Sequence, residues 1–186
     1  MILQGKKVLL RAIEEDDLEM LRDLINDPII EGLVCGFSFP VSKHQQKKWF
    51  EYISQDKDTA RFTVETKEDG PVGYACISDI NWKNRTCFPG LKLSNKVNKT
   101  KGIGYDSVMV LMRYIFEELN LNHIGGKIID YNERSKKLLL GKLNWQQEGL
   151  KRKYIYNDGR YHDVIICSIL KEEYYELLLK TKYWES

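Results

Sequence analysis

The sequence reads Lys99-Thr100-Lys101-Gly102-Ile103-Gly104-Tyr105 directly before its clearest amphipathic helix. Two glycines one residue apart let the backbone come close to a ligand. N–H groups at the start of a helix converge on an anion, and the helix dipole also favours negative charge there. Lys99 and Lys101 add cationic side chains, and a strand through Gly90-Leu91-Lys92-Leu93 leads into the turn. The junction predicts a pyrophosphate site, and hence a cofactor that carries a nucleotide; a plain strand–turn–helix corner is the alternative.

The spacing of these glycines excludes two better-known phosphate loops. A Walker A loop needs four residues between its glycines, followed by Gly-Lys-Ser/Thr. A Rossmann fingerprint would place a third glycine where Ser107 stands, and an acidic residue at the end of the next strand. Gly-x-Gly before a helix therefore does not by itself identify the cofactor.

Length and composition are those of one globular domain over residues 1–186. The formal net charge is +2, and the basic and acidic residues are interspersed, which disfavours a nucleic-acid partner. The segment Met1–Lys7 lacks the order of a signal peptide, and no apolar run approaches membrane-spanning length. We therefore expect a cytoplasmic protein with no membrane partner.

The cysteines and histidines do not predict a metal site. The four cysteines form no Cys-x-x-Cys pair, and only three histidines accompany them. Free, buried thiols are the expected state in a cytosolic protein. The four cysteines are Cys35, Cys76, Cys87 and Cys167.

Apolar periodicity predicts a mixed sheet with helices. We expect strands over 7–12, 61–66, 72–80, 85–93, 123–129, 147–156 and 161–170. Helices are expected from Glu14 to a stop at Asp27-Pro28, after Ser42, after Gly104, over 133–143 and around 174–178, with an irregular segment over 29–40. Pro89-Gly90 inside its strand predicts a bulge or an edge. A β–α–β crossover attached to an antiparallel meander gives a mixed sheet covered by helices.

Several short motifs, taken in this order over nearly the whole chain, resemble the GNAT superfamily of acyl-CoA-dependent N-acetyltransferases. The likeness is greatest to the branch of ribosomal-protein N-terminal and spermidine acetyltransferases. In chain order the motifs are Leu10-Arg11, Asp17-Leu18, Val72-Gly73, Asp79-Ile80, Asn84-Arg85, Lys99-x-x-Gly102-x-Gly104, Asn132-x-x-Ser135, Leu143-Asn144-Trp145, Glu148-Gly149 and Gly159-x-x-x-Asp163.

The resemblance implies an α/β (α+β mixed-sheet) fold: a mostly antiparallel sheet with one splayed parallel pair, flanked by helices. The strands around Leu91 and Ile128 would splay apart, and the pantetheine arm of acetyl-CoA would lie in the gap against Leu91, Lys92 and Leu93. Residues 99–105 would bind the pyrophosphate, and Asn132 and Ser135 would belong to the cofactor site. The implied reaction is acetyl transfer to a primary amine by direct attack, in a chain that could form a homodimer.

The sequence departs from the family pattern at four places. Lys99 stands where Gln or Arg is usual, and it keeps charge without Arg's forked geometry. Asp106 places a carboxylate beside the expected pyrophosphate; we expect it to point into solvent at the start of the helix. Many family members have a tyrosine that acts as the acid toward the CoA thiolate. Here its position is occupied by Leu139, or by Leu140 if the alignment shifts by one residue. The branch's frequent glutamate in the third meander strand is Phe88.

The missing tyrosine and glutamate leave the proton-transfer groups open. An alkylammonium acceptor needs a base, and the resemblance places Asp79 at a strand end facing the acceptor cleft; the alternative is a turn aspartate. Tyr131 could act as acid, or could simply pack at a strand end. His44, in the first turn of a helix, is expected to be a solvent-exposed residue, and Glu51 and Tyr52 could line the acceptor site.

The acceptor amine is not determined by the sequence. A protein N-terminus, a polyamine and an amino sugar all stay open. For the amino sugar Trp82 would offer a stacking surface, although plain packing is the simpler interpretation of that residue. A catalytically silent acyl-CoA sensor, or a binding protein for another nucleotide, is the competing class.

Overall fold

A computed structural model describes residues 2–95 and 102–185 of the chain. Its eight strands form one sheet in the order β1-β2-β3-β4-β5-β6-β8-β7. Within the described residues every neighbouring pair is antiparallel except β5 and β6, which are parallel. The strands are β1 (Leu3–Gln4), β2 (Val8–Arg11), β3 (Ala60–Thr66), β4 (Gly70–Asn81), β5 (Thr86–Leu93), β6 (His123–Ile129), β7 (Gln146–Asn157) and β8 (Arg160–Leu170). The mixed, mostly antiparallel sheet confirms the predicted fold.

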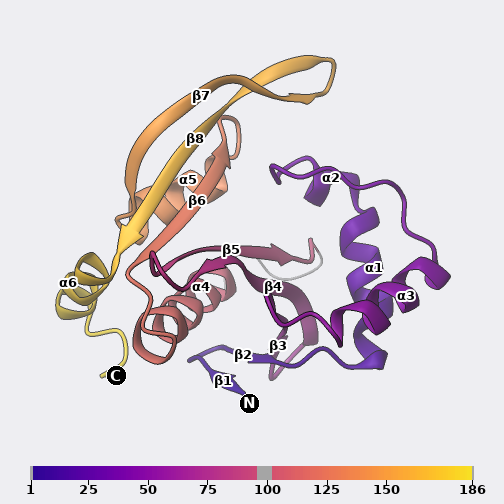
Figure 1. The fold of residues 1–186 in the computed structure, drawn as a ribbon, viewed down its shortest axis with the longest axis horizontal. Helices are drawn as coiled ribbons and strands as arrows, with labels where there is room; N and C mark the ends of the chain where they lie inside the picture. Colours follow the sequence, from indigo (N-terminus) through magenta and orange to yellow (C-terminus); the bar gives the residue numbers. More distant parts are fainter. Residues whose placement is uncertain (1, 96–101, 186) are drawn as a thin grey trace.

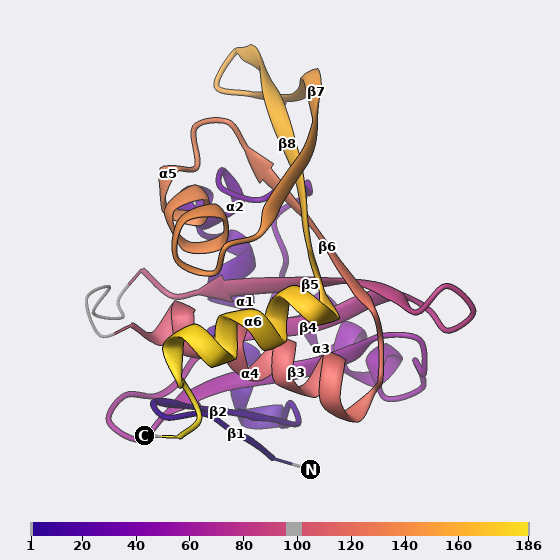
Figure 2. The ribbon, with the colours of Figure 1, turned by 90° about the vertical axis from the view of Figure 1, so that its left-hand side faces the viewer.

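Helices cover both faces of the sheet. Figure 2 shows α4 and α6 in front of the meander strands, with α1 and α3 behind them. Two π-helical turns, Tyr114–Glu118 and Lys137–Lys142, continue α4 and α5. The helices are α1 (Leu18–Asn26), α2 (Pro28–Glu31), α3 (Lys43–Ile53), α4 (Ile103–Arg113), α5 (Glu133–Lys136) and α6 (Lys171–Thr181).

Helix α2 was not predicted, because Asp27-Pro28 was interpreted only as a helix stop. The Asp27 carboxylate accepts hydrogen bonds from the Ile29 and Ile30 N–H groups at 2.8 and 3.3 Å, so it caps a new helix. Pro28 takes the first helical position, where its missing N–H costs nothing. The helix expected after Ser42 is confirmed as α3. The spacing of Ser42 and Gln45 is that of a capping box, and the two residues form its reciprocal hydrogen bonds at 2.9 and 3.2 Å.

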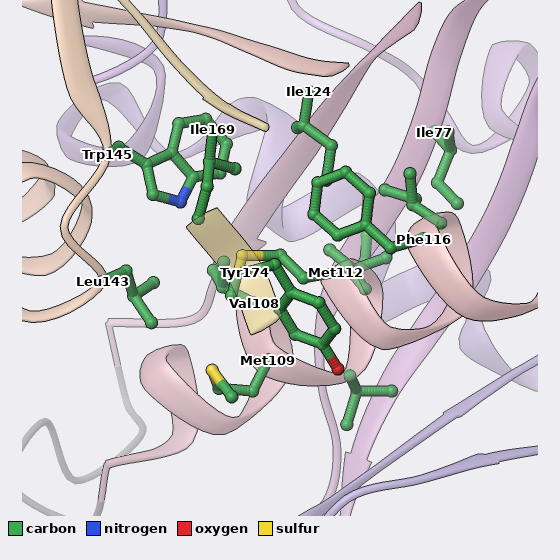
Figure 3. Packing of buried hydrophobic residues seen from close by; sticks show 14 of the residues in the cluster. Ile77, Val108, Met109, Met112, Phe116, Ile124, Leu143, Trp145, Ile169 and Tyr174 are labelled. Atoms are coloured by element: carbon green, nitrogen blue, oxygen red, sulfur yellow. The ribbon is translucent and has the colours of Figure 1, made fainter. Parts of the chain in front are cut away.

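The main core lies between the sheet and the pair α4 and α6. Figure 3 shows Met112 of α4 and Phe116 of its π-helical continuation beside Tyr174, with Ile124 and Ile169 of the strands nearby. The rings of Phe116 and Tyr174 lie 5.2 Å apart, and both are fully buried. The apolar period of the sequence predicts a stripe on this helix, all of which lies in or against the core, and the stripe fixes α4 against the sheet. Its residues are Val108, Leu111, Met112, Ile115, Phe116 and Leu119.

Strands β5 and β6 pair only where they begin. Thr86 is paired with His123 and Cys87 with Ile124, after which the strands diverge (Figure 1). This confirms the splayed parallel pair. Pro89 follows the divergence, on an edge that no longer has a β6 partner, where a missing N–H is tolerated. The predicted bulge is not in β5: the register irregularity lies across from it, between Ser78 and Asn81 of β4.

Candidate active site

The cofactor loop reaches helix α4 through a left-handed glycine. Gly102 has φ +75° and occupies the N-cap position, a conformation that strains any other residue. A Cβ atom on Gly104 would lie 3.6 Å from a Leu93 methyl and 3.8 Å from a Leu138 methyl, so this glycine lies between the end of β5 and the π-helical turn that follows α5. Ile103 is buried and Tyr105 is half-buried, while Lys99, Thr100 and Lys101 lie outside the described residues. The glycines thus leave room for a ligand between β5 and the turn after α5.

Asp106 does not point into solvent, as the sequence led us to expect. Its side chain is fully buried, and it accepts hydrogen bonds from the N–H groups of Lys6, Lys7 and Val8 at 3.1, 2.5 and 2.9 Å. The Tyr183 hydroxyl donates a fourth bond at 2.6 Å. The expectation was wrong because the N-terminal turn and the C-terminal segment, remote in sequence, close over the first turn of α4. Four donors therefore fix this carboxylate against the N-terminal turn and Tyr183.

Strand β5 presents alternating side chains, and among the described residues no strand pairs with its β6-facing edge beyond Cys87. Leu91 and Leu93 pack against the main core, whereas the Lys92 ammonium forms an ion pair with Glu31 of α2. Because β6 has left, alternate N–H and C=O groups over 88–93 face the gap rather than another strand. That edge can hydrogen-bond an extended ligand.

The β6 arm ends in Asn132, which caps α5. Its Oδ1 accepts from the Ser135 N–H at 3.0 Å, and its Nδ2 donates to the Leu33 carbonyl at 3.0 Å. The side chain is 6% exposed, so these two bonds fix its orientation. The contact of Asn132 and Ser135 with a cofactor stays a prediction.

Tyr131 is bonded within the protein through its hydroxyl. The group donates to the Gly32 carbonyl and accepts from Asn157 Nδ2 at 2.7 Å. Its ring packs edge-on against His162, with centroids 4.6 Å apart. To act as an acid, Tyr131 must first release Gly32.

The segment over residues 27–33, which we term the α2 strap, contacts both arms of the splayed pair. On the β5 side Glu31 pairs with Lys92, and Asp27 accepts from Asn95 Nδ2 at 3.0 Å. On the β6 side its contacts are the bonds to Tyr131 and Asn132 described above. Figure 1 shows α2 beyond the open end of the gap. The sequence did not predict this arrangement, although the Asp-Pro pair could have signalled a helix start.

Asp79 lies on β4 close to the point where β5 leaves β6. Its side chain is exposed, and its φ of +50° places it in the left-handed region, next to the register irregularity. The Ser78 hydroxyl donates to the Phe88 carbonyl at 2.9 Å and lies 3.4 Å from the Asp79 carboxylate. A turn aspartate and a base open to solvent are both compatible with this geometry.

The residues that replace the family's acid and base are apolar and packed. Leu139 and Leu140 contact the main core. Phe88 lies under Gly125, and the Lys127 ammonium lies 5.6 Å from the centre of its ring. Of the other candidates, His44 is exposed, as expected. Trp82 was expected to pack against the protein, but its side chain is 63% exposed.

The thiols are poor nucleophiles. Cys35 and Cys76 are half-buried, Cys87 and Cys167 are fully buried, and all four are free. Burial raises the pKa of Cys76, and it raises the pKa of Cys87 and of Cys167 to about 12. Little thiolate exists near neutral pH, so an acyl-enzyme is disfavoured.

A cavity of about 630 Å³ adjoins α1 and the end of β5. Five carboxylates line it, together with Met20, Leu24, Ile30, Pro71, Val72, Ser94 and Asn95. The five acidic residues are Asp16, Glu19, Asp23, Asp27 and Asp69.

The family model described as the acetyltransferase (GNAT) domain matches residues 7–141, which include the splayed strands and the cofactor loop. The chain belongs to the GNAT acetyltransferase family. It is 28% identical over 170 residues to the SPbeta prophage-derived uncharacterized N-acetyltransferase YokL of Bacillus subtilis, covering 91% of this chain and 93% of YokL. It is 30% identical over 175 residues to the uncharacterized N-acetyltransferase p20 of Bacillus licheniformis, covering 92% of this chain and 97% of p20.

The fold of this GNAT chain also matches solved structures. Spermidine N-acetyltransferase from Vibrio cholerae, in complex with CoA and spermine, superposes with a TM-score of 0.83 at 23% identity. The match covers 92% of this chain and 99% of that one. Membership of the GNAT family makes the chain an N-acetyltransferase that uses acetyl-CoA and acetylates an amine. In the described part of the chain, no helix is long and apolar enough to cross a membrane.

Proposed function

We propose that this enzyme holds acetyl-CoA in the gap between β5 and β6 and transfers its acetyl group directly to a primary alkylamine. The observations that carry the proposal are the end of β5–β6 pairing after Cys87 and Ile124, which lets the two strands diverge, and the left-handed Gly102 that starts α4. Gly104 leaves open the space that a side chain would fill between Leu93 and Leu138. These residues fit a slender arm ending in a pyrophosphate.

Acetyl-CoA supplies an activated thioester. The free backbone edge of Leu91, Lys92 and Leu93 would orient the arm, and its N–H groups would donate to the carbonyl oxygen as negative charge develops there. The N–H groups that start α4 at Gly102–Tyr105 would face the pyrophosphate. Strand β5 and the start of α4 would thus hold the two ends of the ligand.

The acceptor must lose a proton before it attacks. With a pKa of about 10.4, only about one alkylamine in a thousand is neutral near pH 7.4. Asp79 is our candidate for the base, acting directly or through one water. Its exposure and its position near the divergence of β5 and β6 support this role. Tyr131 is the candidate acid, on condition that the Gly32 bond opens.

For the acceptor we favour an alkylamine that carries further positive charge, such as a polyamine. The carboxylate-lined cavity beside the end of β5 supports this choice, because clustered carboxylates attract polycations to this side of the protein. The cavity adjoins Val72, near the opposite end of β4 from Asp79, and is not itself the place of proton transfer. The similarity in fold to a spermidine N-acetyltransferase agrees with it. A peptide N-terminus and an amino sugar stay as alternative acceptors. We also propose that residues 1–186 form one domain and that the chain can form a homodimer.

The test is a screen of polyamines, peptides with free N-termini and amino sugars with acetyl-CoA, read by release of free thiol. We expect polyamines to give the highest kcat/KM. Gly104→Trp, which fills the space between the arms, should lose both thiol release and acetyl-CoA binding. If the wild type bound acetyl-CoA but none of the amines tested led to release of free thiol, the silent-sensor alternative would replace the proposal. A covalent acetyl group on a cysteine would overturn direct attack.

A further inference from the structure

We propose that Lys7, on the N-terminal strand, is a phosphate-binding residue of the cofactor site, and that buried Asp106 positions it. The inference rests on the proposed placement of acetyl-CoA at Gly102 and Gly104. It adds a cation to the site from a segment almost one hundred residues away, which no motif of the loop includes.

The first step is the position of the Lys7 backbone. Asp106, in the first turn of α4, receives three consecutive N–H groups, those of Lys6, Lys7 and Val8, within 3.1 Å. Three successive donors on one carboxylate fix the direction of the chain as it enters β2. Gly5 makes this approach possible, because a Cβ atom there would come within 2.5 Å of the same carboxylate.

The second step is the direction of the Lys7 side chain. A Cβ atom on Gly102 would lie 3.3 Å from the Lys7 ammonium nitrogen, so the ammonium lies directly beside the N-cap of α4. The neighbouring Lys6 goes elsewhere: its ammonium lies over the Tyr183 ring, 4.7 Å from the ring centre. Of these two exposed lysines, only Lys7 is directed toward the loop.

The third step is electrostatic. The positive end of the α4 dipole and the Lys7 ammonium lie side by side at Gly102, which produces a local field that favours a di-anionic group. The negative charge of Asp106 lowers this potential. Its two oxygens are already engaged by the Lys6, Lys7 and Val8 N–H groups and the Tyr183 hydroxyl, so within the described residues the carboxylate has four hydrogen-bond donors without the Lys7 ammonium. A pyrophosphate over Gly102 would receive backbone N–H groups from one side and the ammonium from the other.

The test compares Lys7→Gln with Lys6→Gln, two changes of the same kind on adjacent exposed residues. Calorimetry would measure Kd for CoA, for dephospho-CoA, which lacks the 3′-phosphate, and for pantetheine, which lacks the pyrophosphate as well. Lys7→Gln should weaken CoA and dephospho-CoA about five- to tenfold, as expected for one charge-assisted contact open to water. Pantetheine affinity should not change, Lys6→Gln should stay within about twofold of wild type, and Lys7→Arg should recover most of the loss.

The outcomes separate this inference from the placement on which it rests. If the wild type bound no CoA, both would fall. If the wild type bound CoA and Lys7→Gln bound it equally well, only the role of Lys7 would fall. A parallel loss of pantetheine affinity would also refute that role, because it would indicate a distorted site rather than a lost phosphate contact. Thermal unfolding of each variant checks that its fold is intact.

Discussion

Replacing Asp106 by Asn should cost this protein a large part of its stability, because one buried carboxylate serves four donors. Oδ1 accepts from the Lys6 N–H and the Tyr183 hydroxyl, and Oδ2 accepts from the Lys7 and Val8 N–H groups. An amide has one oxygen, so in either orientation its NH₂ group faces two former donors.

The magnitude follows from the better of the two orientations. With the NH₂ group toward Tyr183, the hydroxyl can turn and accept from it, so the Lys6 N–H loses its partner and the remaining bonds lose their charge assistance. A hydrogen bond to a charged group contributes about 1.5–3 kcal/mol, which gives a loss of about 2–4 kcal/mol for the variant. Total stabilities are about 5–15 kcal/mol, so the variant should fold but unfold early.

Urea unfolding followed by far-UV circular dichroism measures this loss. The matched control is Asp23→Asn on α1, an exposed carboxylate whose ion pair among the described residues is with its neighbour Arg22 at 3.1 Å, and Arg22 is itself in reach of Glu19. The control should change the free energy of unfolding by less than about 0.5 kcal/mol. A wild-type midpoint for Asp106→Asn would show that its four bonds do not hold the N-terminal turn and the C-terminal segment on α4.

Three further predictions concern the reaction and acid stability. Asp79→Asn should lower kcat/KM by about two to four decades with acetyl-CoA affinity unchanged, and the loss should shrink as pH rises and more amine arrives neutral; normal turnover at pH 7 would make Asp79 a turn residue only. Tyr131→Phe should destabilise the protein by about 1–3 kcal/mol in thermal unfolding, since Gly32 and Asn157 lose a partner. If kcat stays at the wild-type value in that variant, the acid is another group. Asp17 is buried, which alone would raise its pKa, but bonds from Arg11, the Glu14 N–H and Thr63 outweigh burial and hold the pKa below 3.8. Its stabilising effect is thus present above about pH 4 and is lost as pH falls through the lowered pKa. Asp17→Asn should therefore be less stable than wild type at pH 7, and its free energy of unfolding should fall less on acidification below about pH 4. Parallel pH profiles of wild type and variant in urea unfolding would contradict this.

The order of strands and helices could be predicted because each element carries its own period and its own caps. The stripe from Val108 to Leu119 and the capping box at Ser42 are local signals that survive in the fold. The splay of β5 and β6 has no such local signal. It was implied by the resemblance to a family, with Pro89 as the one residue that agrees with a lost strand partner.

The parts of the site that were missed depend on contacts between distant residues. Nothing in the spacing around Asp106 shows that residues 6–8 and Tyr183 converge on it, so a general preference for exposed aspartates at helix starts gave the wrong answer. The same holds for Lys7, whose approach to Gly102 is a consequence of that convergence. Helix α2 is different, because Asp27-Pro28 is a local start signal that was interpreted only as a stop.

The α2 strap connects the two strands on either side of the proposed cofactor gap, so a change in the width of the gap must also change the position of the strap. It holds β5 through Lys92 and Asn95, and it holds β6 through Tyr131 and Asn132. A ligand that widens the gap must stretch one of these contacts, and so must a ligand that displaces the strap. If acetyl-CoA widens the gap and the acceptor displaces the strap, the free energy of that distortion would enter both binding equilibria, and each ligand would change the affinity of the other by the same factor. Substitutions in the strap should therefore alter this coupling as well as either affinity alone.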